Sequence, residues 1–410
     1  MRISTLSIYS NATTQLNSLQ SALARTQAQL SANRRILSPS DDPVASARAL
    51  EIGQSQQMNE QFATNRTSAR SALAATEGAL QNASDLMLDI QGLAVKAGSG
   101  ALKASDREAI ATELEGKLED LLGVANSTDG TGGYLFSGYM ATTQPFGRTP
   151  GGAQYQGDQG QRQLQVGASR RMPLSVPGNE VFGGNLTGNG TFQTRAALAN
   201  TGTGVISSGT VADPQALAKR DYAYTVSFTV AGTPPASTYT VNDITTDPPT
   251  PVPGQTDQAF VPGQAIAFNG VSFEVSGAPA DGDAFTVTPS ARESVFTTVT
   301  DLIGALRAPA VDEAGQAALK NGVNRALDNL GTAHEKVLTV RASVGAHMKE
   351  IDYLDSAGDD LDVQYQSTLS DLQDLDVVKA ISDFSMQQTT LQAAQMSFKT
   401  MSGLSLFNYL

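Results

Sequence analysis

The chain has 410 residues, enough for two or three domains and a sizeable buried core. It carries 27 Lys and Arg against 40 Asp and Glu, and the formal net charge of −13 argues against binding to nucleic acid or to an anionic membrane. With no cysteine and two histidines, disulfides, thiolate chemistry and His-rich metal sites are excluded. No stretch reaches the ~18 consecutive apolar residues of a membrane helix, so we expect no membrane insertion.

The composition changes twice along the chain. Both ends are rich in Ala, Leu and Gln, whereas the middle holds most of the Gly, Pro and aromatic residues. This pattern predicts a multidomain α+β protein, in which a long antiparallel helical bundle or coiled coil from both termini carries an inserted all-β outer domain. The expected parts are a terminal coiled coil from 1–42 plus 377–410, a long-helix bundle from 43–130 plus 291–376, and an outer β domain from 131–290.

The first segment predicts an amphipathic helix that continues to Leu37. Leucines follow a heptad pattern with gaps at Thr26 and Asn33. Pro39 and Pro43 then interrupt the helix, because proline restricts the residue before it and lacks an N–H donor. The leucines of the stripe are Leu16, Leu19, Leu23, Leu30 and Leu37.

Two further helices are predicted before the middle of the chain. Asp42 is placed to cap a helix that begins at Pro43, and an apolar face continues from there to about residue 97. Gly98 to Gly100 ends this helix. Ser105 and Glu108 then form the pattern of a capping box, which predicts a helix that closes between Asn126 and Gly133.

The middle of the chain alternates apolar and polar residues, as half-buried strands do. One alternating run spans Tyr222 to Val230 and another spans Val271 to Val275. Asn269-Gly270 and Asp281-Gly282-Asp283 are turn signals, and the second is expected to be a hairpin turn and not a calcium loop. One or two small antiparallel β domains are therefore expected.

The C-terminal part returns to helical periodicity. An apolar stripe continues over 313–370, breaks at 371–376, and resumes in a final helix from Val377 that leads into an apolar tail. The two long helices at opposite ends of the chain match in length, so each can bury the apolar stripe of the other.

The two terminal helices are the main functional candidates. A lone amphipathic helix buries too little apolar area to offset its ordering entropy, so the terminal helices order only by pairing with each other or with neighbouring copies. Pairing within one molecule would be an ordinary core contribution, and pairing between molecules would drive polymerisation. The expected assembly interface comprises Leu16, Leu19, Leu23, Leu30, Ile381, Phe384, Leu391, Phe398, Met401, Leu406 and Phe407.

Charge is distributed unequally between the two ends. Residues 1–40 contain four arginines and no acid, whereas 350–378 contain nine acids and no base. Such opposite charges could steer one segment or subunit onto another, although a charge run also occurs as an ordinary solvated face. The steering candidates are Arg25, Arg34, Arg35, Asp359, Asp360 and Asp362.

No residue pattern indicates catalysis. His334-Glu335 begins like a zinc-protease helix, but Leu338 stands where the second histidine ligand would be. His347 lies too far along the helix to replace it, and both histidines are expected on helix surfaces. We therefore expect no catalytic residue, no cofactor and no metal site.

Several motifs resemble those of the flagellar hook-associated protein 3 family, the junction proteins of the bacterial flagellin superfamily. The resemblance rests on the N-terminal Met1 to Thr5 and on Arg34 to Leu50, with its Ser-Asp-Asp-Pro-Val-Ala core. It continues in Gly133 to Gly138 with Pro145-Phe146, in the strand-rich stretch 155–182, and in the C-terminal Leu404 to Leu410. A further match is Ser276 to Asp283, whereas 183–265 matches least and is interpreted as an enlarged outer domain.

The resemblance implies an architecture and a role. The terminal helices would form an inner coiled-coil layer, the long helices the next shell, and the β insert the outer surface. The protein would form a self-assembled ring at the hook–filament junction, between the other hook-associated junction protein and the flagellin filament. It would be exported by the flagellar type III apparatus without a cleaved signal peptide, while an export chaperone holds the C-terminal helix.

Two other functions stay open at the level of sequence. The chain could be a flagellin-type filament subunit, although the Phe407-Asn408-Tyr409-Leu410 ending argues against this. More remotely, the outer domain could be a glycan-binding or hydrolytic module carried on a filament. Its acids lie mostly in turn-like contexts, which disfavours an enzyme.

Overall fold

The computed structural model describes residues 5–99, 102–130, 132–232 and 236–407, and these fold into two compact units. One unit combines the residues up to Thr64 with those from Tyr353 onward, and the other spans Asn65–Asp352. The division falls inside two long helices, whereas the sequence placed domain limits at the helix breaks near 42 and 377. Those domain limits therefore stay a prediction.

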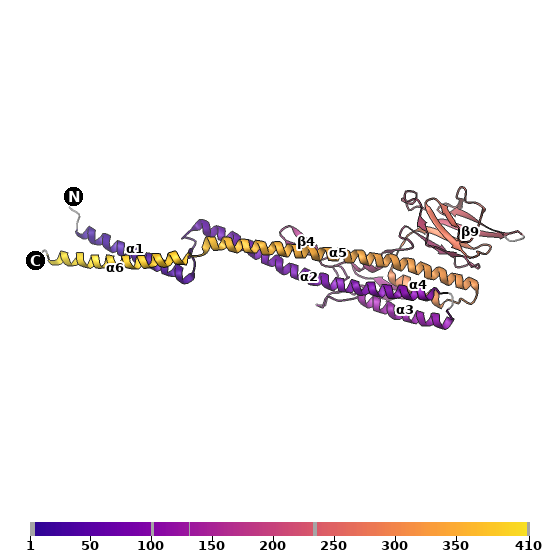
Figure 1. The fold of residues 1–410 in the computed structure, drawn as a ribbon, viewed down its shortest axis with the longest axis horizontal. Helices are drawn as coiled ribbons and strands as arrows, with labels where there is room; N and C mark the ends of the chain where they lie inside the picture. Colours follow the sequence, from indigo (N-terminus) through magenta and orange to yellow (C-terminus); the bar gives the residue numbers. More distant parts are fainter. Residues whose placement is uncertain (1–4, 100–101, 131, 233–235, 408–410) are drawn as a thin grey trace. The chain divides into compact units, whose positions relative to one another are not determined.

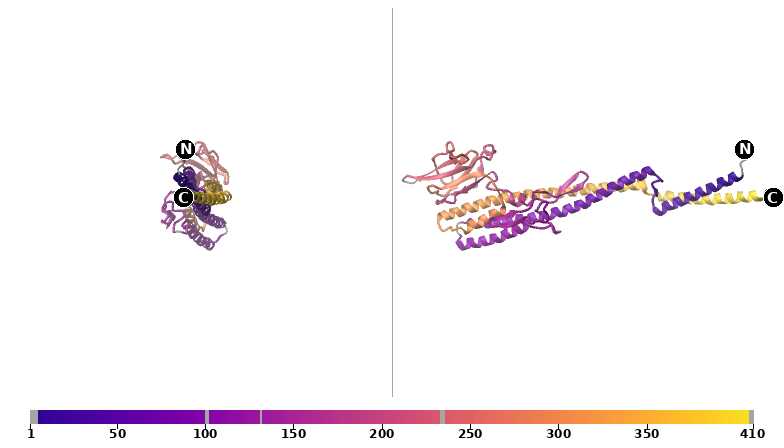
Figure 2. Two further views of the ribbon diagram at one scale, coloured as in Figure 1. Left: turned by 90° about the vertical axis from the view of Figure 1, so that its left-hand side faces the viewer. Right: turned by 180° about the vertical axis from the view of Figure 1, so that it is seen from behind.

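The first unit contains a pair of terminal helices, α1 (Thr5–Ala32) and α6 (Val377–Phe407). They lie side by side and run antiparallel (Figures 1 and 2). The expectation that the first helix continues to Leu37 is wrong by about one turn. Helix α1 ends at Ala32 because the next residue, Asn33, adopts a left-handed backbone with φ of 50°.

The same unit contains the first part of α2 (Pro43–Ala97) and the last part of α5 (Glu313–Gln373). Asp42 accepts a hydrogen bond from the backbone N–H of Ala45 at 3.0 Å, so the predicted cap with Pro43 at the first helical position is confirmed. Asp376 caps α6 in the same way through the N–H of Lys379 at 3.0 Å. Each break between helices therefore ends in a short acidic cap.

The second unit holds a four-helix bundle, made of the rest of α2 and α5 with α3 (Ala104–Ala125) and α4 (Val295–Arg307). Lys103, and not Ser105, occupies the cap position of α3, because Asp106 accepts the N–H of Lys103. The bundle core is apolar on all four helices. Its buried residues include Leu73, Leu80, Met87, Ile90, Ile110, Leu114, Leu121, Val299, Leu302, Val323, Leu330, Val337, Val344 and Ile351.

Short strands cover the bundle. They form three two-stranded antiparallel ribbons, with one π-helical turn, η1 (Asn179–Gly183), before the third. Asn65 and Arg66 of α2 donate side-chain hydrogen bonds to the carbonyls of Gln165 and Val166, which attaches one ribbon to the bundle. The ribbons are β1 (Phe146–Thr149) with β2 (Gly152–Tyr155), β3 (Gln163–Gly167) with β4 (Arg170–Pro173), and β5 (Asn185–Leu186) with β16 (Arg292–Glu293).

The outer β domain consists of two antiparallel sheets that enclose one apolar core. The first has the order β11-β10-β9-β15-β6 with β12 also paired to β10, and the second has the order β13-β14-β7 with β8 also paired to β14. The strands of the first sheet are β6 (Phe192–Ala196), β9 (Tyr224–Ala231), β10 (Ala236–Asp243), β11 (Thr250–Pro251), β12 (Gln258–Ala259) and β15 (Ala284–Pro289). Those of the second are β7 (Val205–Ile206), β8 (Thr210–Val211), β13 (Ala265–Phe268) and β14 (Val271–Ser276).

The two predicted turns differ in outcome. Asn269 and Gly270 both have positive φ and join the paired strands β13 and β14, as a two-residue hairpin requires. Asp281 to Asp283 is no hairpin turn, because β14 and β15 belong to different sheets. Asp283 instead accepts hydrogen bonds from the N–H groups of Thr201 and Gly202, so the segment fixes a crossing between sheets.

Candidate functional site

The interface between α1 and α6 is an apolar stripe that the pair buries only in part. Leu391 is 9% exposed and is the most buried leucine of the stripe. The ring centroids of Tyr9 and Phe398 lie 4.8 Å apart, near the end of the pair that holds the two chain termini. The other predicted residues of the stripe are half-buried: Leu16, Leu19, Leu23, Leu30, Phe384 and Phe398.

The gap at Thr26 in the leucine stripe is occupied by a polar contact. Thr26 is 8% exposed, and its hydroxyl donates to Oε1 of Gln387 at 3.0 Å. The hydroxyl also lies 3.1 Å from the carbonyl of Ala22. A buried polar group in a helix pair favours one register, since any other register leaves it without its partner.

Two predicted interface residues are exposed in the single chain. Ile381 is 52% exposed and Met401 is 47% exposed, while the side chains of Leu406 and Phe407 lie outside the described residues. Five other apolar residues of this helix pair are exposed and were not among the predicted interface residues: Tyr9, Val377, Val378, Met386 and Met396. The exposed apolar residues of α6 could have been identified from the sequence, because they are apolar residues outside the stripe that was expected to face α1.

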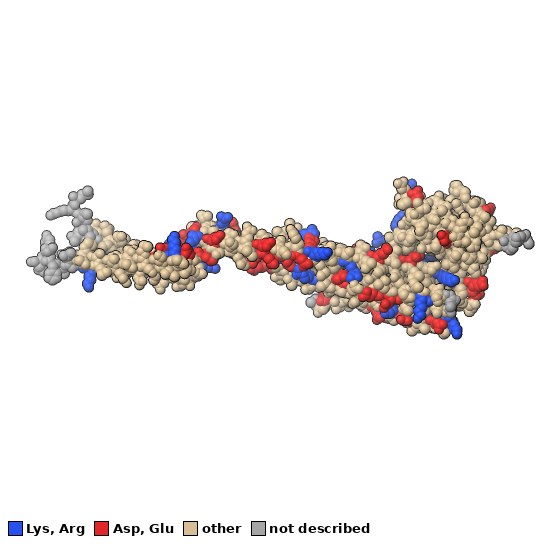
Figure 3. Space-filling view, viewed as in Figure 1, with Lys and Arg blue, Asp and Glu red and all other residues tan. Residues whose placement is uncertain are grey.

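Charge is nearly absent from this helix pair. Arg25 is the single charged residue of α1, and α6 carries Lys379, Asp383 and Lys399. Figure 3 shows the face of the pair as mostly uncharged, whereas Asp, Glu, Lys and Arg are frequent over the long helices. Depletion of charge with exposed Met, Tyr and Ile is typical of the core of a protein–protein interface.

The predicted steering residues lie on two separate segments, with the arginines in or just after the last part of α1 and the acids in the last part of α5. Arg25 pairs with Asp41 at 3.0 Å and Arg35 pairs with Asp42 at 3.4 Å, so two of the arginines bind acids of the adjacent α1–α2 connection. Backbone hydrogen bonds lower the pKa of both acids. No salt bridge among the described residues joins these arginines to Asp359, Asp360 or Asp362.

The two helix breaks nevertheless meet. The N–H of Arg35 donates to the carbonyl of Gln373 at 2.7 Å, and its guanidinium donates to the carbonyl of Leu372 at 2.7 Å. Arg34 forms a β-bridge with Asp374. The connection from α1 to α2 is therefore held against the connection from α5 to α6 mainly by backbone contacts.

The motif residues of 133–182 gather in a buried aromatic cluster at the bundle. Phe136 and Phe146 each pack edge-to-face on Phe182, with centroids 5.4 and 5.8 Å apart. Phe296 of α4 contacts Phe146 at 5.1 Å and Phe182 at 6.0 Å. All four rings are fully buried, so these motifs fix the ribbons to the bundle and offer no open site.

Asp158 organises the loop beside this cluster. Its carboxylate accepts the N–H groups of Tyr139, Met140 and Gly160, and these hydrogen bonds lower its pKa. The Tyr155 hydroxyl donates to the carbonyls of Phe136 and Asp158, and burial raises the pKa of Tyr155 to about 12. Both residues are saturated by backbone contacts, which indicates a structural role.

His334 was expected on a helix surface, but it is half-buried between long helices. Its Nε2 lies 2.8 Å from the Ser84 hydroxyl. His347 is half-buried as well. Within the described ranges, no three His, Asp or Glu side chains cluster as a metal site, and no helix combines the length and hydropathy needed to cross a membrane.

Comparisons with known proteins agree on one family. Residues 3–141 match the bacterial flagellin N-terminal helical region, and residues 192–289 match the D3 domain of flagellar hook-associated protein 1. Flagellar hook-associated protein 3 of Escherichia coli is 28% identical over 99% of both chains. Hook-associated protein-3 of Legionella pneumophila and FlgL of Xanthomonas campestris are each 32% identical. Each alignment covers 78% of this chain. It covers 98% of the Legionella chain, with a TM-score of 0.74, and 99% of the Xanthomonas chain, with a TM-score of 0.70.

Proposed function

Because the chain belongs to the flagellar hook-associated protein 3 family, also named FlgL, we propose that it joins the hook of a bacterial flagellum to the flagellin filament. In this role it is a structural adaptor with no catalysis and no cofactor. The α+β architecture, with helices from both termini and an inserted β domain, is the one that the sequence predicted, and the confirmed family accords with it.

The observation that carries the proposal is the incomplete burial of the stripe between α1 and α6. Leu16, Leu19 and Leu23 remain half-buried in the single chain, and Ile381 and Met396 are more than half exposed. Apolar area that stays in water offers about 25 cal/mol per Å² to any partner that covers it. Neighbouring copies packed around the pair would therefore complete the core that one chain leaves open.

The expected partners follow from this arrangement. Copies of the chain form a ring, the other hook-associated junction protein contacts one side of the ring, and flagellin contacts the other. Contacts of this kind are heterologous, and they continue into a filament unless a different protein caps them. A protein with different partners below and above is thus suited to a junction.

Export is proposed to precede assembly. The chain passes through the flagellar type III apparatus uncleaved, and an export chaperone covers α6 until the chain leaves the cell. The surface of α6 carries little charge and several exposed apolar residues, which supports such a cover, because an exposed apolar helix would otherwise aggregate in the cell. The final location is outside the cell at the hook–filament junction.

Complementation of a strain that lacks the gene tests the adaptor role. The variant Leu391→Asp places a charge in the α1–α6 stripe, and Leu23→Asp does the same from α1. Both are expected to abolish filament attachment. The matched control is Leu338→Asp, which changes an exposed leucine of α5 in the other unit and should support normal filaments.

Antibody labelling of isolated flagella locates the wild-type protein. Label confined to the hook–filament boundary supports the adaptor. Label along the whole filament would identify a flagellin-type subunit instead, and normal filaments on the Leu391→Asp chain would contradict the proposed assembly interface.

A further inference from the structure

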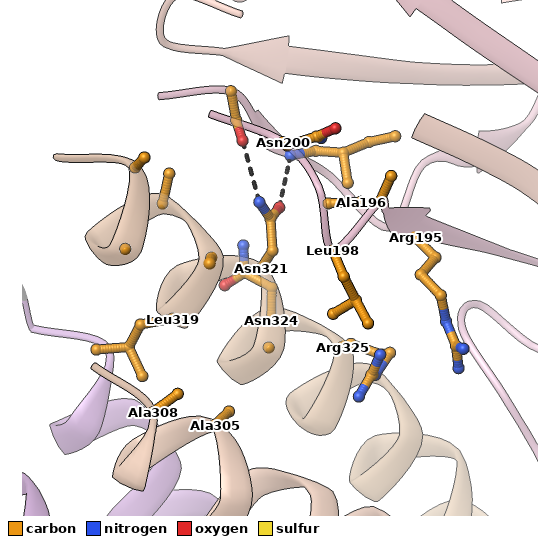
Figure 4. Close-up of a pocket in the computed structure, with 18 of the residues that line it drawn as sticks. Arg195, Ala196, Leu198, Asn200, Ala305, Ala308, Leu319, Asn321, Asn324 and Arg325 are labelled. Atoms are coloured by element: carbon orange, nitrogen blue, oxygen red, sulfur yellow. Dashed lines mark hydrogen bonds between the residues drawn. The ribbon is translucent and has the colours of Figure 1, made fainter. Parts of the chain in front are cut away.

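A cavity of about 550 Å³ lies between the outer β domain and the helices α4 and α5, within the second unit (Figure 4). The stretch from β6 to β7 forms one wall, and α4 and α5 form the other. This volume falls in the range of small-molecule sites, which occur preferentially at the junction of two domains. No part of the proposed adaptor role uses this cavity.

Polar contacts hold the two walls in place. Asn321 of α5 donates to the carbonyl of Gly204 at 3.0 Å and accepts the N–H of Ile206 at 3.0 Å. Further along α5, Asn329 accepts the N–H of Gly188 at 2.8 Å, and the Thr332 hydroxyl donates to the carbonyl of Leu186. The cavity is therefore part of a fixed arrangement, and it has a formed shape before any ligand enters.

Three polar groups on the cavity wall have hydrogen-bonding capacity that the chain itself does not use. Arg195 and Asn324 are exposed to solvent, and among the described residues their guanidinium and amide groups have no polar partner. Asp328 is bonded only by the hydroxyl of Ser208, and burial raises its pKa to about 6. By contrast, Arg325 is neutralised by Asp301 at 3.1 Å.

The lining also includes apolar and small residues. Ala305 and Ala308 lie on α4, and Leu198 extends from the strand connection toward α5 beside Arg325 (Figure 4). Leu198 is fully exposed in the free chain, which is unusual for a leucine on a domain junction. An occupant of the cavity would cover it.

We propose that this cavity binds a small polyhydroxylated molecule of mono- or disaccharide size. Arg195 offers only donors, ionised Asp328 offers only acceptors, and Asn324 offers both. A hydroxyl group both donates and accepts, so a ligand with several hydroxyls satisfies all three, while its C–H face contacts Leu198. A simple anion would be repelled by Asp328 and a simple cation by Arg195.

Gly304 allows a direct test of occupancy. It lies in α4 on the cavity wall, and a Cβ at this position would meet no atom within 4 Å. Gly304→Leu has room for its Cβ and should place a bulky side chain at the cavity wall, and leucine also favours the helix more than glycine does. A melting temperature equal to or above that of the wild type confirms that the variant is folded.

The binding experiment uses the full chain and named probes. Calorimetry and saturation-transfer NMR with glucose, maltose and glucuronate at pH 7.5 should give a dissociation constant of about 1 mM or tighter for at least one probe. Gly304→Leu should abolish that binding. Arg195→Gln should weaken glucuronate at least tenfold relative to glucose, and Lys219→Gln, an exposed lysine outside the cavity lining, should change nothing.

Three results would overturn the proposal. The first is no binding of any of the three sugars to the wild-type chain. The second is unchanged binding to Gly304→Leu, which would place the sugar elsewhere. The third is binding of inorganic phosphate or spermidine, tested in parallel, with an affinity above that of every sugar, which would show that charge and not hydroxyl groups selects the ligand.

Discussion

The hydroxyl of Thr26 on α1 donates to Oε1 of Gln387 on α6 at 3.0 Å, across a helix pair that is otherwise held by apolar contacts. This polar pair occupies the gap in the leucine stripe. It sets which residues of the two helices face each other, and it limits how stable the pair is in a single chain. Both effects suit the assembly role that we propose for this helix pair.

Replacing both members of this polar pair should stabilise the free terminal helices. In Thr26→Leu/Gln387→Leu, two apolar side chains meet where a hydrogen bond was, and the helix pair should gain about 1 kcal/mol over wild type. Thr26→Leu alone should gain less, because it removes the donor from Gln387. The helix content of the two single variants and the double variant, compared by circular dichroism, checks the order. A double variant less helical than wild type would contradict this account of the gap.

Truncation of Leu391 should loosen the pair and leave the bundle unaffected. Leu391→Ala removes the most buried leucine of the stripe, and the expected loss is about 2 kcal/mol, at the lower end for buried leucines because the site borders solvent. Limited proteolysis should then cleave α1 and α6 faster than in wild type. Leu338→Ala, at an exposed leucine of α5, is the matched control and should leave the cleavage rate unchanged. Equal rates for both variants would argue against a packed stripe.

The aromatic cluster should dominate the stability of the second unit. Phe296→Ala removes a fully buried ring that contacts Phe146 and Phe182, and we expect a loss of about 3–5 kcal/mol in urea unfolding of that unit. Phe296→Leu retains much of the volume and should lose less. If the alanine variant loses under about 1 kcal/mol, the motif residues 133–182 do not anchor the ribbons to the bundle.

Asp158 should make the stability of this region depend on pH in the acidic range. Its pKa is lowered from 3.8 in the folded chain, because the N–H groups of Tyr139, Gly160 and Met140 bind the ionised form. The stabilisation is therefore complete above the unfolded pKa and is lost as the pH falls through the folded pKa. The melting temperatures of wild type and Asp158→Asn should differ at pH 6 and converge as the pH falls below the folded pKa. A difference that persists unchanged at low pH would exclude the carboxylate as its source.

The sequence predicted the helical framework well, because the signals there are local. Asp42 with Pro43 marked the start of α2, and Gly98 marked its end. The end of α1 was missed, since Leu37 continued the heptad although Asn33 had already left helical geometry. Helix α4 was not predicted, although Ser294 caps it through the N–H of Phe296, because its 13 residues carry a much shorter apolar stripe than the long helix that follows.

Contacts between distant parts of the chain were harder to predict. The leucine spacing identified the inner stripe of α1, yet nothing in it assigned Gln387 as the partner of Thr26. Charge runs suggested steering toward the acids of 350–378, while Arg25 and Arg35 pair with acids of the α1–α2 connection. The cavity beside Asp328 depends on where the outer domain packs against α5, and no local pattern encodes that contact.

The central claim is that α1 and α6 are assembly elements completed by neighbouring copies. Hydrogen exchange of the dilute, full-length chain, followed by mass spectrometry, tests it most directly. Amides of α1 and α6 are expected to exchange much faster than amides around Leu80 and Leu330 in the bundle, which stay protected for hours. Equal, long-lived protection of the terminal helices and the bundle in the monomer would contradict the account.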